Sequence, residues 1–155
     1  MATPDFVLAL RAKIGHDPLW LAGVTAVVLR GRQVLLVRRA DNGEWTPVTG
    51  IVDPGEQPAA AATREVLEEA NVVASAVRLA SIGVTEPVTY ANGDRSQYLD
   101  LTFRCTYVSG EPHPADGENT DAAWFELDDL PAMAPHMLTR LAGALSDDPA
   151  AVFER

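Results

Sequence analysis

The stretch from Gly50 to Val72, GIVDPGEQPAAAATREVLEEANV, constrains the fold most, because it has the pattern of a tight loop running directly into a helix. The Asp-Pro-Gly sequence at positions 53–55 favours a turn, since proline presets one backbone dihedral and glycine accepts a positive φ. Pro58 suits the first helical position, where its missing N–H is no loss. Asn71 tolerates the left-handed conformation that often ends a helix. The segment therefore predicts a loop and a helix that ends near residue 71.

Three glutamates of this predicted helix, Glu65, Glu68 and Glu69, stand at i, i+3 and i+4 and are expected to share one face. Like charges at this spacing repel by roughly 0.2–0.5 kcal/mol per pair, and the helix macrodipole disfavours anions toward the C-terminal end. A hard divalent cation would offset both effects, and oxygen-only ligands favour Mg²⁺ or Mn²⁺ over zinc. On spacing alone, a solvated acidic face is an equal alternative. The opposite face, expected to be buried, carries Ala59, Thr63, Val66, Leu67 and Ala70.

The same segment resembles the Nudix box residue by residue. The one departure is Asn71, where the family usually has glycine, and asparagine is the next best residue for that backbone conformation. The run from Trp124 to Pro131 also resembles the usual C-terminal stretch of the family. The positions that match the box are Gly50, Glu56, Arg64, Glu65, Val66, Glu68, Glu69 and Val72.

This resemblance implies an α/β fold, namely a single-domain α/β/α sandwich around a mixed β-sheet in which the box forms a loop and a helix. It also implies metal ligands. Glu65 and Glu69 are the leading ligands, and Glu68 is a third ligand or the base that positions a water molecule. The backbone carbonyl of Gly50 often joins the metal shell.

Further site residues are expected around the box. Arg64 and Glu56 are expected to form an ion pair that orients both side chains and supports the loop, a role close to a purely structural one. The resemblance implies that a loop such as the one at 111–120 adds an acid to the metal site. Glu118 is the preferred candidate, and Asp116 and Glu111 are its competitors.

Three arginines are candidates for contacts with the substrate. Arg38 and Arg39 end a predicted strand, where they either contact phosphate at the site mouth or form a solvated strand end. Arg104 lies on the polar side of an alternating strand and serves either the substrate or a surface ion pair. His113 and His136 are given no role.

The reaction implied by the resemblance is the hydrolysis of a nucleoside diphosphate linked to another group, X, with a small nucleotide as substrate. Nucleoside triphosphates and ADP-ribose are both open. One alternative is a non-catalytic Nudix module that senses a nucleotide, which the intact box disfavours. Another is an isomerase-like relative on the same metal scaffold, which would need a positioned acid or thiol. Cys105, expected in the core, fits that role poorly.

The remaining chain alternates between strand and helix patterns. Residues 6–14 have the pattern of a short amphipathic helix, and residues 19–29 form a continuous apolar run typical of a strand buried on both faces. Asn92-Gly93 predicts a hairpin. Residues 99–107 alternate, with Cys105 on the inward side. We expect an N-terminal helical segment at 1–18, the Nudix domain at 19–147 and a polar, frayed tail at 148–155.

The composition limits which partners and which cellular compartment are expected for the protein. The 155 residues carry a net charge of −10, which argues against a general binder of nucleic acids or acidic membranes. The single cysteine excludes an internal disulfide framework, and the N-terminus lacks the pattern of a secretion signal. Cytoplasmic residence is therefore expected. The apolar stripe of the N-terminal helix, which comprises Phe6, Val7, Leu10 and Ile14, predicts a homodimer.

Overall fold

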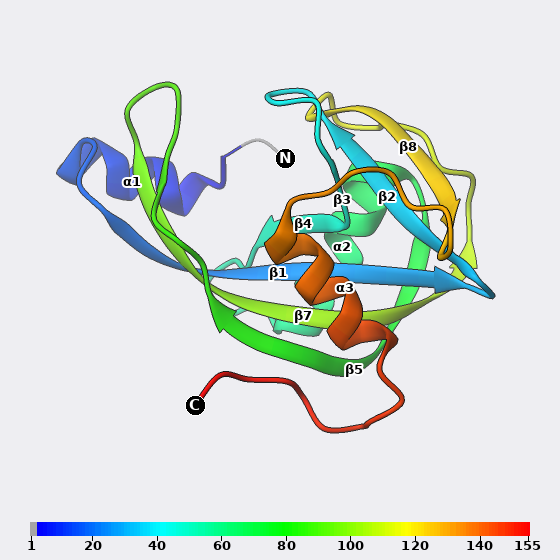
Figure 1. The fold of residues 1–155 in the computed structure, drawn as a ribbon. Coiled ribbons are helices and arrows are strands. Elements are labelled where there is room, and N and C mark those ends of the chain that lie inside the picture. Colours follow the sequence, from blue (N-terminus) through cyan, green and yellow to red (C-terminus); the bar gives the residue numbers. More distant parts are fainter. Residues whose placement is uncertain (1–2) are drawn as a thin grey trace.

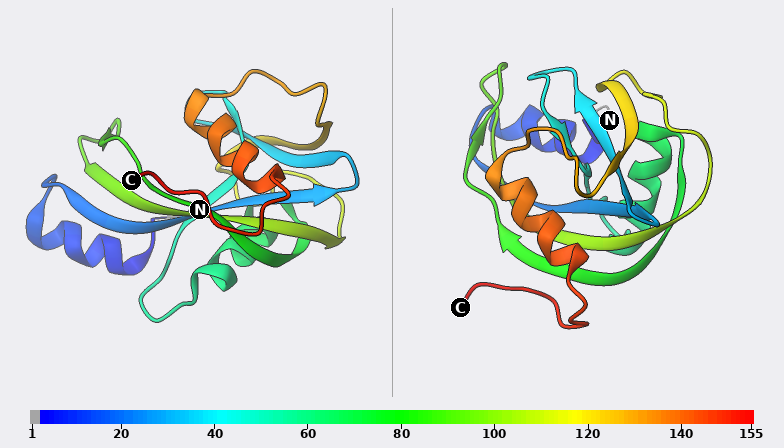
Figure 2. Two further views of the ribbon diagram at one scale, coloured as in Figure 1. Left: turned by 60° about the horizontal axis from the view of Figure 1, so that its bottom comes forward. Right: turned by 45° about the vertical axis from the view of Figure 1, so that its right-hand side comes forward.

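The computed structural model describes residues 3–155, and over that range a mixed β-sheet lies between helices on its two faces (Figures 1 and 2). Helix α2 (Pro58–Ala70) covers one face and α3 (Pro135–Leu145) covers the other. Helix α1 (Asp5–Ile14) lies beside the β6–β7 hairpin (Figure 1). The strands are β1 (Leu19–Arg30), β2 (Gln33–Arg39), β3 (Trp45–Thr46), β4 (Val48–Ile51), β5 (Val73–Val84), β6 (Val88–Thr89), β7 (Arg95–Ser109) and β8 (Asn119–Glu126).

The sheet is built around β1. Its strand order is β3-β2-β1-β7-β5, with β4 paired to β1, β8 to β2 and β6 to β7. Strands β1 and β7 run parallel, and the other pairs are antiparallel. Residues 23–28 of β1 are buried without interruption, as expected for a strand covered on both faces. The predicted mixed sheet in an α/β/α sandwich is therefore confirmed.

Two apolar clusters lie on the two sides of the sheet. Val24, Ala26 and Val28 of β1 join the cluster under α2, whereas Val27 joins the cluster under α3, because successive strand residues point to opposite faces. The predicted alternation of β7 holds in the same way, and Cys105 is fully buried in the α2 cluster. Burial raises the pKa of the Cys105 thiol to about 12, so this residue is an inert core side chain.

The N-terminal helix is held to the hairpin by polar contacts. Arg11 Nη2 donates to the backbone oxygen of Arg95 at 2.6 Å and to Ser96 Oγ at 3.1 Å. Of the predicted apolar stripe, Val7 is buried, Phe6 and Ile14 are half-buried and Leu10 is 38% exposed. Residues 1 and 2 of the predicted segment 1–18 lie outside the described residues.

The tail differs from the expectation of a frayed end. Val152 forms a parallel bridge with Ser81 of β5, and its backbone N–H donates to the Ala80 carbonyl at 2.9 Å. These hydrogen bonds cover part of an edge strand whose backbone would otherwise be open to water. Within residues 3–155, no helix is long and apolar enough to cross a membrane.

Candidate active site

The site begins where β4 passes under α2. Gly50 pairs with Val24 of β1, and a Cβ built on Gly50 would lie 2.2 Å from Glu65 Cγ and Cδ. Glycine is needed here because the side chain of Glu65 occupies that space, and not because of a positive φ. The Glu65 carboxylate is thereby fully buried against the strand that carries Gly50.

Arg64 connects the loop of the box with its helix. Its guanidinium forms a bidentate pair with Glu56, with N–O distances of 2.8 and 2.9 Å, and donates to the Ile51 carbonyl at 3.2 Å. Its Nη1 also reaches Glu65 Oε1 at 2.9 Å and Glu68 Oε2 at 3.0 Å. The hydrogen bond from Arg64 lowers the pKa of Glu56. The expected Arg64–Glu56 pair is therefore present, and it also orients two of the predicted catalytic glutamates.

The burial of α2 corrects the predicted helix faces. Leu67, expected in the core, is 50% exposed, whereas Glu65 is 0% and Glu69 5% exposed. The buried positions recur at helical spacing, and both glutamates fall within that stripe. The sequence pattern places the glutamates outside because charged side chains are rarely buried without a partner. The buried residues of α2 are Ala61, Ala62, Glu65, Val66, Glu69 and Ala70.

The C-terminal end of α2 is capped by a distant loop. Asn71 adopts φ 56° and ψ 31°, the predicted left-handed conformation. The backbone N–H groups of His113 and Ala115 donate to the Ala70 and Glu69 carbonyls at 3.2 and 3.1 Å. These bonds satisfy carbonyl groups that a helix end leaves without intrahelical partners. The loop that follows β7 is thus fixed against the last turn of α2.

This docking brings three acids together. Carboxylate oxygens of Glu69, Asp116 and Glu118 lie within 4.8 Å of one another. Of the three candidates from the loop, Glu118 and its competitor Asp116 both reach the site, whereas Glu111 contributes its backbone oxygen to Asn71 Nδ2 at 3.2 Å. Glu65 and Glu68 do not belong to this group of three.

Asn119 is a site residue that the sequence pattern does not identify. Its Nδ2 donates to Glu69 Oε2 at 3.0 Å, and both residues are buried. The only signal for it in the sequence is its position next to Glu118, since a buried amide has no motif of its own. It supplies Glu69 with a hydrogen-bond donor inside the protein.

Both buried glutamates have raised pKa values. Burial raises the pKa of Glu65 to about 7, although the neighbouring Arg64 acts in the opposite direction. Burial likewise raises the pKa of Glu69 to about 7, with the hydrogen bond from Asn119 opposing the shift and the charge of Asp116 adding to it. Two acids that are costly to charge therefore lie one helical turn apart at the base of the site.

These residues suit a divalent cation. Glu65 Oε2 is buried and, among residues 3–155, has no hydrogen-bond partner. A buried carboxylate oxygen without a partner is costly, and a bound cation would supply the missing interaction. The other available donors are carboxylate oxygens, which Mg²⁺ and Mn²⁺ prefer. The chemistry of the donor set thus fits the predicted ion.

The structure separates the three predicted substrate arginines. Arg39 lies opposite Asn119 in the β2–β8 ladder, interacts electrostatically with Glu69 and pairs with Asp41 at 2.7 Å. Arg38 Nε donates to the Gly43 carbonyl at 3.1 Å. Arg104 alternates with Cys105 and so lies on the α3 side of β7, away from α2. Only Arg39 is thus placed next to the acids.

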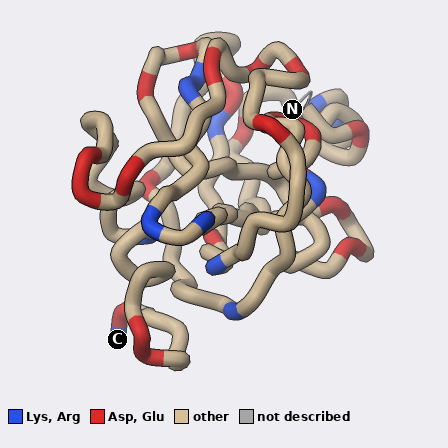
Figure 3. The backbone as a smooth tube through the Cα atoms, turned by 90° about the vertical axis from the view of Figure 1, so that its right-hand side faces the viewer, with Lys and Arg blue, Asp and Glu red and all other residues tan. Residues whose placement is uncertain are grey.

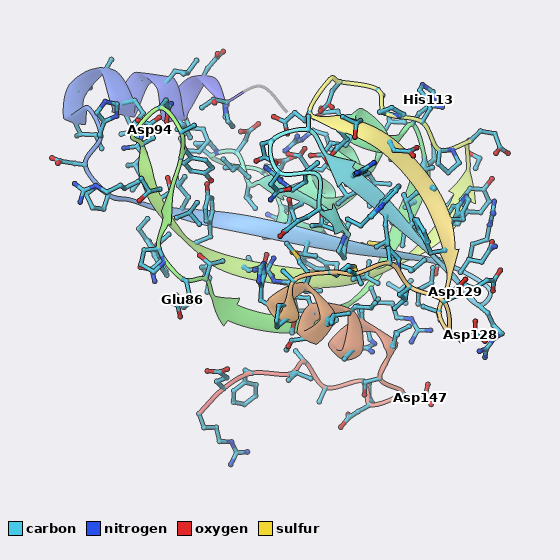
Figure 4. The ribbon with its side chains drawn as sticks, turned by 45° about the horizontal axis from the view of Figure 1, so that its top comes forward. Glu86, Asp94, His113, Asp128, Asp129 and Asp147 are labelled. Carbon is cyan, nitrogen blue, oxygen red and sulfur yellow. The ribbon has the colours of Figure 1, made fainter. Side chains whose placement is uncertain are left out.

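The surface of the protein is mainly acidic, in line with its net charge of −10. Figure 3 shows Asp and Glu on loops around the whole outline of this view, with several Lys and Arg nearer its centre. Figure 4 shows His113 at the outer rim of the loop after β7, pointing away from the body of the protein. His113 and His136 are both exposed.

Comparisons with known proteins agree with this geometry. The NUDIX domain family model matches residues 20–143. A MutT-like protein of Streptomyces ambofaciens is 34% identical over 131 residues, which cover 83% of this chain and 79% of that protein. The NAD-capped RNA hydrolase NudC of Vibrio cholerae is 30% identical over 122 residues, or 77% of this chain and 42% of that protein. The chain thus spans less than half the length of this relative.

A comparison with solved structures also finds proteins of the same fold. A MutT NUDIX hydrolase from Burkholderia pseudomallei superposes with a TM-score of 0.66 at 25% sequence identity, over 81% of this chain and 98% of that one. The mixed sheet, the box geometry and the family match lead to one conclusion: the chain belongs to the Nudix family. The resemblance inferred from residues 50–72 is therefore confirmed, and the relatives named above are hydrolases or MutT-like proteins.

Proposed function

We propose that this protein hydrolyses the diphosphate bond of a nucleoside diphosphate linked to another group, X, with the help of Mg²⁺ or Mn²⁺. The observation that carries the proposal is the pair of buried glutamates, of which Glu69 clusters with the carboxylates of Asp116 and Glu118 and Glu65 has an oxygen without a hydrogen-bond partner among residues 3–155. A fold that only needed a stable helix would place apolar residues at these two positions. The presence of two acids at positions 65 and 69 therefore favours a role in binding a cation.

The roles of the residues follow from their contacts. Glu65, Glu69, Glu118 and the Gly50 carbonyl are the proposed ligands of the cation, and Asp116 is close enough to replace or join Glu118. A bound divalent cation neutralises charge on the bridging and leaving oxygens and lowers the pKa of a bound water.

The half-exposed Glu68 is held by Arg64 and is the proposed ligand or base that takes a proton from the attacking water. Because the same guanidinium also contacts Glu65, Arg64 is a positioning residue for both glutamates. Arg39 is the proposed phosphate contact at the mouth of the site, since it lies next to the acids.

The group X must be identified by testing several candidate substrates. Nucleoside triphosphates and ADP-ribose both carry the required diphosphate. Relatives named as NAD-capped RNA hydrolases add NAD and an RNA carrying it to the candidates, so the expected absence of nucleic-acid substrates stays a prediction.

The decisive experiment is turnover of this panel, including nucleotide sugars and dinucleoside polyphosphates, with Mg²⁺, with Mn²⁺ and with excess chelator. We expect hydrolysis of at least one compound, absent in chelator and restored by the metal. Undiminished turnover in chelator would refute the metal mechanism. Binding of a nucleotide without turnover under any condition would instead support the non-catalytic module.

A further inference from the structure

Arg39 lies on the same face of the sheet as Glu69. The β2–β8 ladder has a bulge between Arg38 and Arg39, which places Asn119 opposite Arg39. Cross-strand partners project from the same face, with their Cβ atoms roughly 4.5–5.5 Å apart. Because Asn119 Nδ2 donates to Glu69 Oε2 at 3.0 Å, the side chain of Arg39 begins beside a residue that contacts the acidic site.

The turn that follows Arg39 is fastened to the segment that carries Glu118. The Ala40 N–H donates to the Glu118 carbonyl at 2.9 Å, and the carboxylate of Glu118 belongs to the group of three acids. The turn is also closed by its own backbone, because the Gly43 N–H donates to the Arg39 carbonyl and the Arg39 N–H to the Glu44 carbonyl, both at 2.9 Å. The backbone alone therefore fixes this turn relative to the acids.

Asp41 in this turn holds the guanidinium of Arg39. Arg39 Nε donates to Asp41 Oδ1 at 2.9 Å, and Arg39 Nη2 donates to Asp41 Oδ2 at 2.7 Å. This bidentate pair uses one edge of the planar guanidinium and leaves the two N–H groups of Nη1 outside it. The side chains of Arg39 and Asp41 are 35% and 56% exposed, so an anion from solvent can reach the guanidinium.

The pair is poorly suited to a purely structural role. Exposed ion pairs contribute little to stability, because water and salt screen them, and the turn is already closed by the backbone hydrogen bonds described above. The pair does restrict the side chain of Arg39. Ordering a rotamer-rich side chain during binding lowers affinity, and an arginine that a carboxylate already holds avoids most of that cost.

We propose that Asp41 is a positioning residue, which holds the Nε–Nη2 edge of Arg39 so that Nη1 is directed at the diphosphate of the substrate. The proposal rests on the function given above, in which Arg39 contacts phosphate at the mouth of the site. In the opposite case Asp41 would compete with the phosphate for the guanidinium. The two cases differ in sign, because removal of Asp41 weakens phosphate binding in the first and strengthens it in the second.

The test measures the binding of methylenediphosphonate, whose bridging carbon prevents hydrolysis, by calorimetry in Mg²⁺. Salt of about 0.3 M screens the direct effect of the Asp41 charge on the anion. Arg39→Ala should raise the Kd by about 10- to 150-fold, as expected for the loss of a charged hydrogen bond. Asp41→Ala should raise it by about 2- to 12-fold, because Arg39 must then be ordered during binding.

A double-mutant cycle separates positioning from a general effect on the turn. If Asp41 acts only through Arg39, the double variant Arg39→Ala/Asp41→Ala should bind the probe as Arg39→Ala does, within about twofold. Asp128→Ala is the matched control, since it removes the carboxylate of another exposed pair, Arg32–Asp128, at 3.6 Å. This control should bind the probe as wild type does.

The outcomes decide the role of Asp41 separately from the proposed function. Tighter or unchanged binding by Asp41→Ala, or an equal loss with and without Arg39, would refute positioning. If wild type hydrolyses a nucleotide but Arg39→Ala binds the probe normally, positioning is refuted while the function stands. If wild type binds the probe but hydrolyses no compound of the panel, the function is wrong and the variants still decide the role of Asp41. If wild type does neither, both proposals are wrong.

Discussion

Replacing Glu69 with glutamine tests whether this buried carboxylate serves function at the expense of stability. The change removes one charge at nearly constant shape. The glutamine oxygen still accepts the hydrogen bond that Asn119 Nδ2 donates to Glu69 Oε2 at 3.0 Å. The variant therefore isolates the effect of charge from the effect of packing.

The expected magnitude follows from the pKa of Glu69. Burial raises this pKa from 4.5 to about 7, so between these pH values the folded protein holds a proton that the unfolded chain has released. The contribution of this group to the free energy of unfolding therefore falls as the pH rises through that window. Above pH 7 the ionised carboxylate costs the metal-free protein on the order of 3 kcal/mol.

Urea unfolding in excess chelator, followed by circular dichroism at pH 5 and pH 8, measures this cost. Glu69→Gln should match wild type within about 1 kcal/mol at pH 5 and exceed it by about 2–3 kcal/mol at pH 8. Glu68→Gln is the matched control, since Glu68 is half-exposed and should change stability little at either pH. With Mg²⁺, the stability of wild type should rise more than that of the Glu69→Gln variant, whose turnover should fall by orders of magnitude.

The reasoning would be refuted if Glu69→Gln were less stable than wild type at pH 8. Glu69 would then stabilise the fold through its charge. A gain of equal size at both pH values would also contradict it, because the effect would not follow ionisation. Near-normal turnover of the variant would remove Glu69 from the set of metal ligands.

Three further predictions follow from the backbone and the surface. Gly50→Ala should lower stability by about 1–3 kcal/mol and abolish turnover, because its Cβ would overlap Glu65, whereas Gly83→Ala, with nothing within 4 Å, should do neither in melting and activity assays. Asn71→Gly should be tolerated and Asn71→Val should cost roughly 1–2 kcal/mol at φ 56°; equal urea midpoints for the two would disprove the strain. We also expect a homodimer through the apolar stripe of α1, whose Leu10 is 38% exposed, and light scattering that shows a monomer at tens of micromolar would count against it.

Much of the box was predictable because its signals are local. Pro58 and Asn71 mark the first residue of α2 and the residue just after its end, as their backbone preferences required. The Arg64–Glu56 pair and the alternation of β7 likewise depend on short spacings. Val66 and Ala70 were predicted correctly as buried residues of α2, whereas the prediction placed Leu67 inside and Glu65 and Glu69 outside. It failed for the glutamates because charged side chains are usually exposed.

The rest of the site depends on contacts between distant segments. No local pattern predicts that the loop after β7 caps α2 and so brings Asp116 and Glu118 to Glu69. Asn119 was missed for the same reason, because its role arises from the side chain that it faces, Glu69. Arg38, Arg39 and Arg104 looked alike as candidates, and strand alternation and register distinguished them.

The parallel ladder between β1 and β7 has a consequence for how the protein is made. It joins Leu19 to Ser96 and Leu29 to Thr106, so the most apolar strand leaves the ribosome long before its partner is synthesised. Such distant pairing slows folding. During that interval the apolar strand β1 has no β7 to pair with and is prone to aggregate. Asp116 and Glu118, which lie in the loop after β7, have not yet been synthesised. The nascent chain should therefore complete its acidic site only late in synthesis, after β8 has left the ribosome.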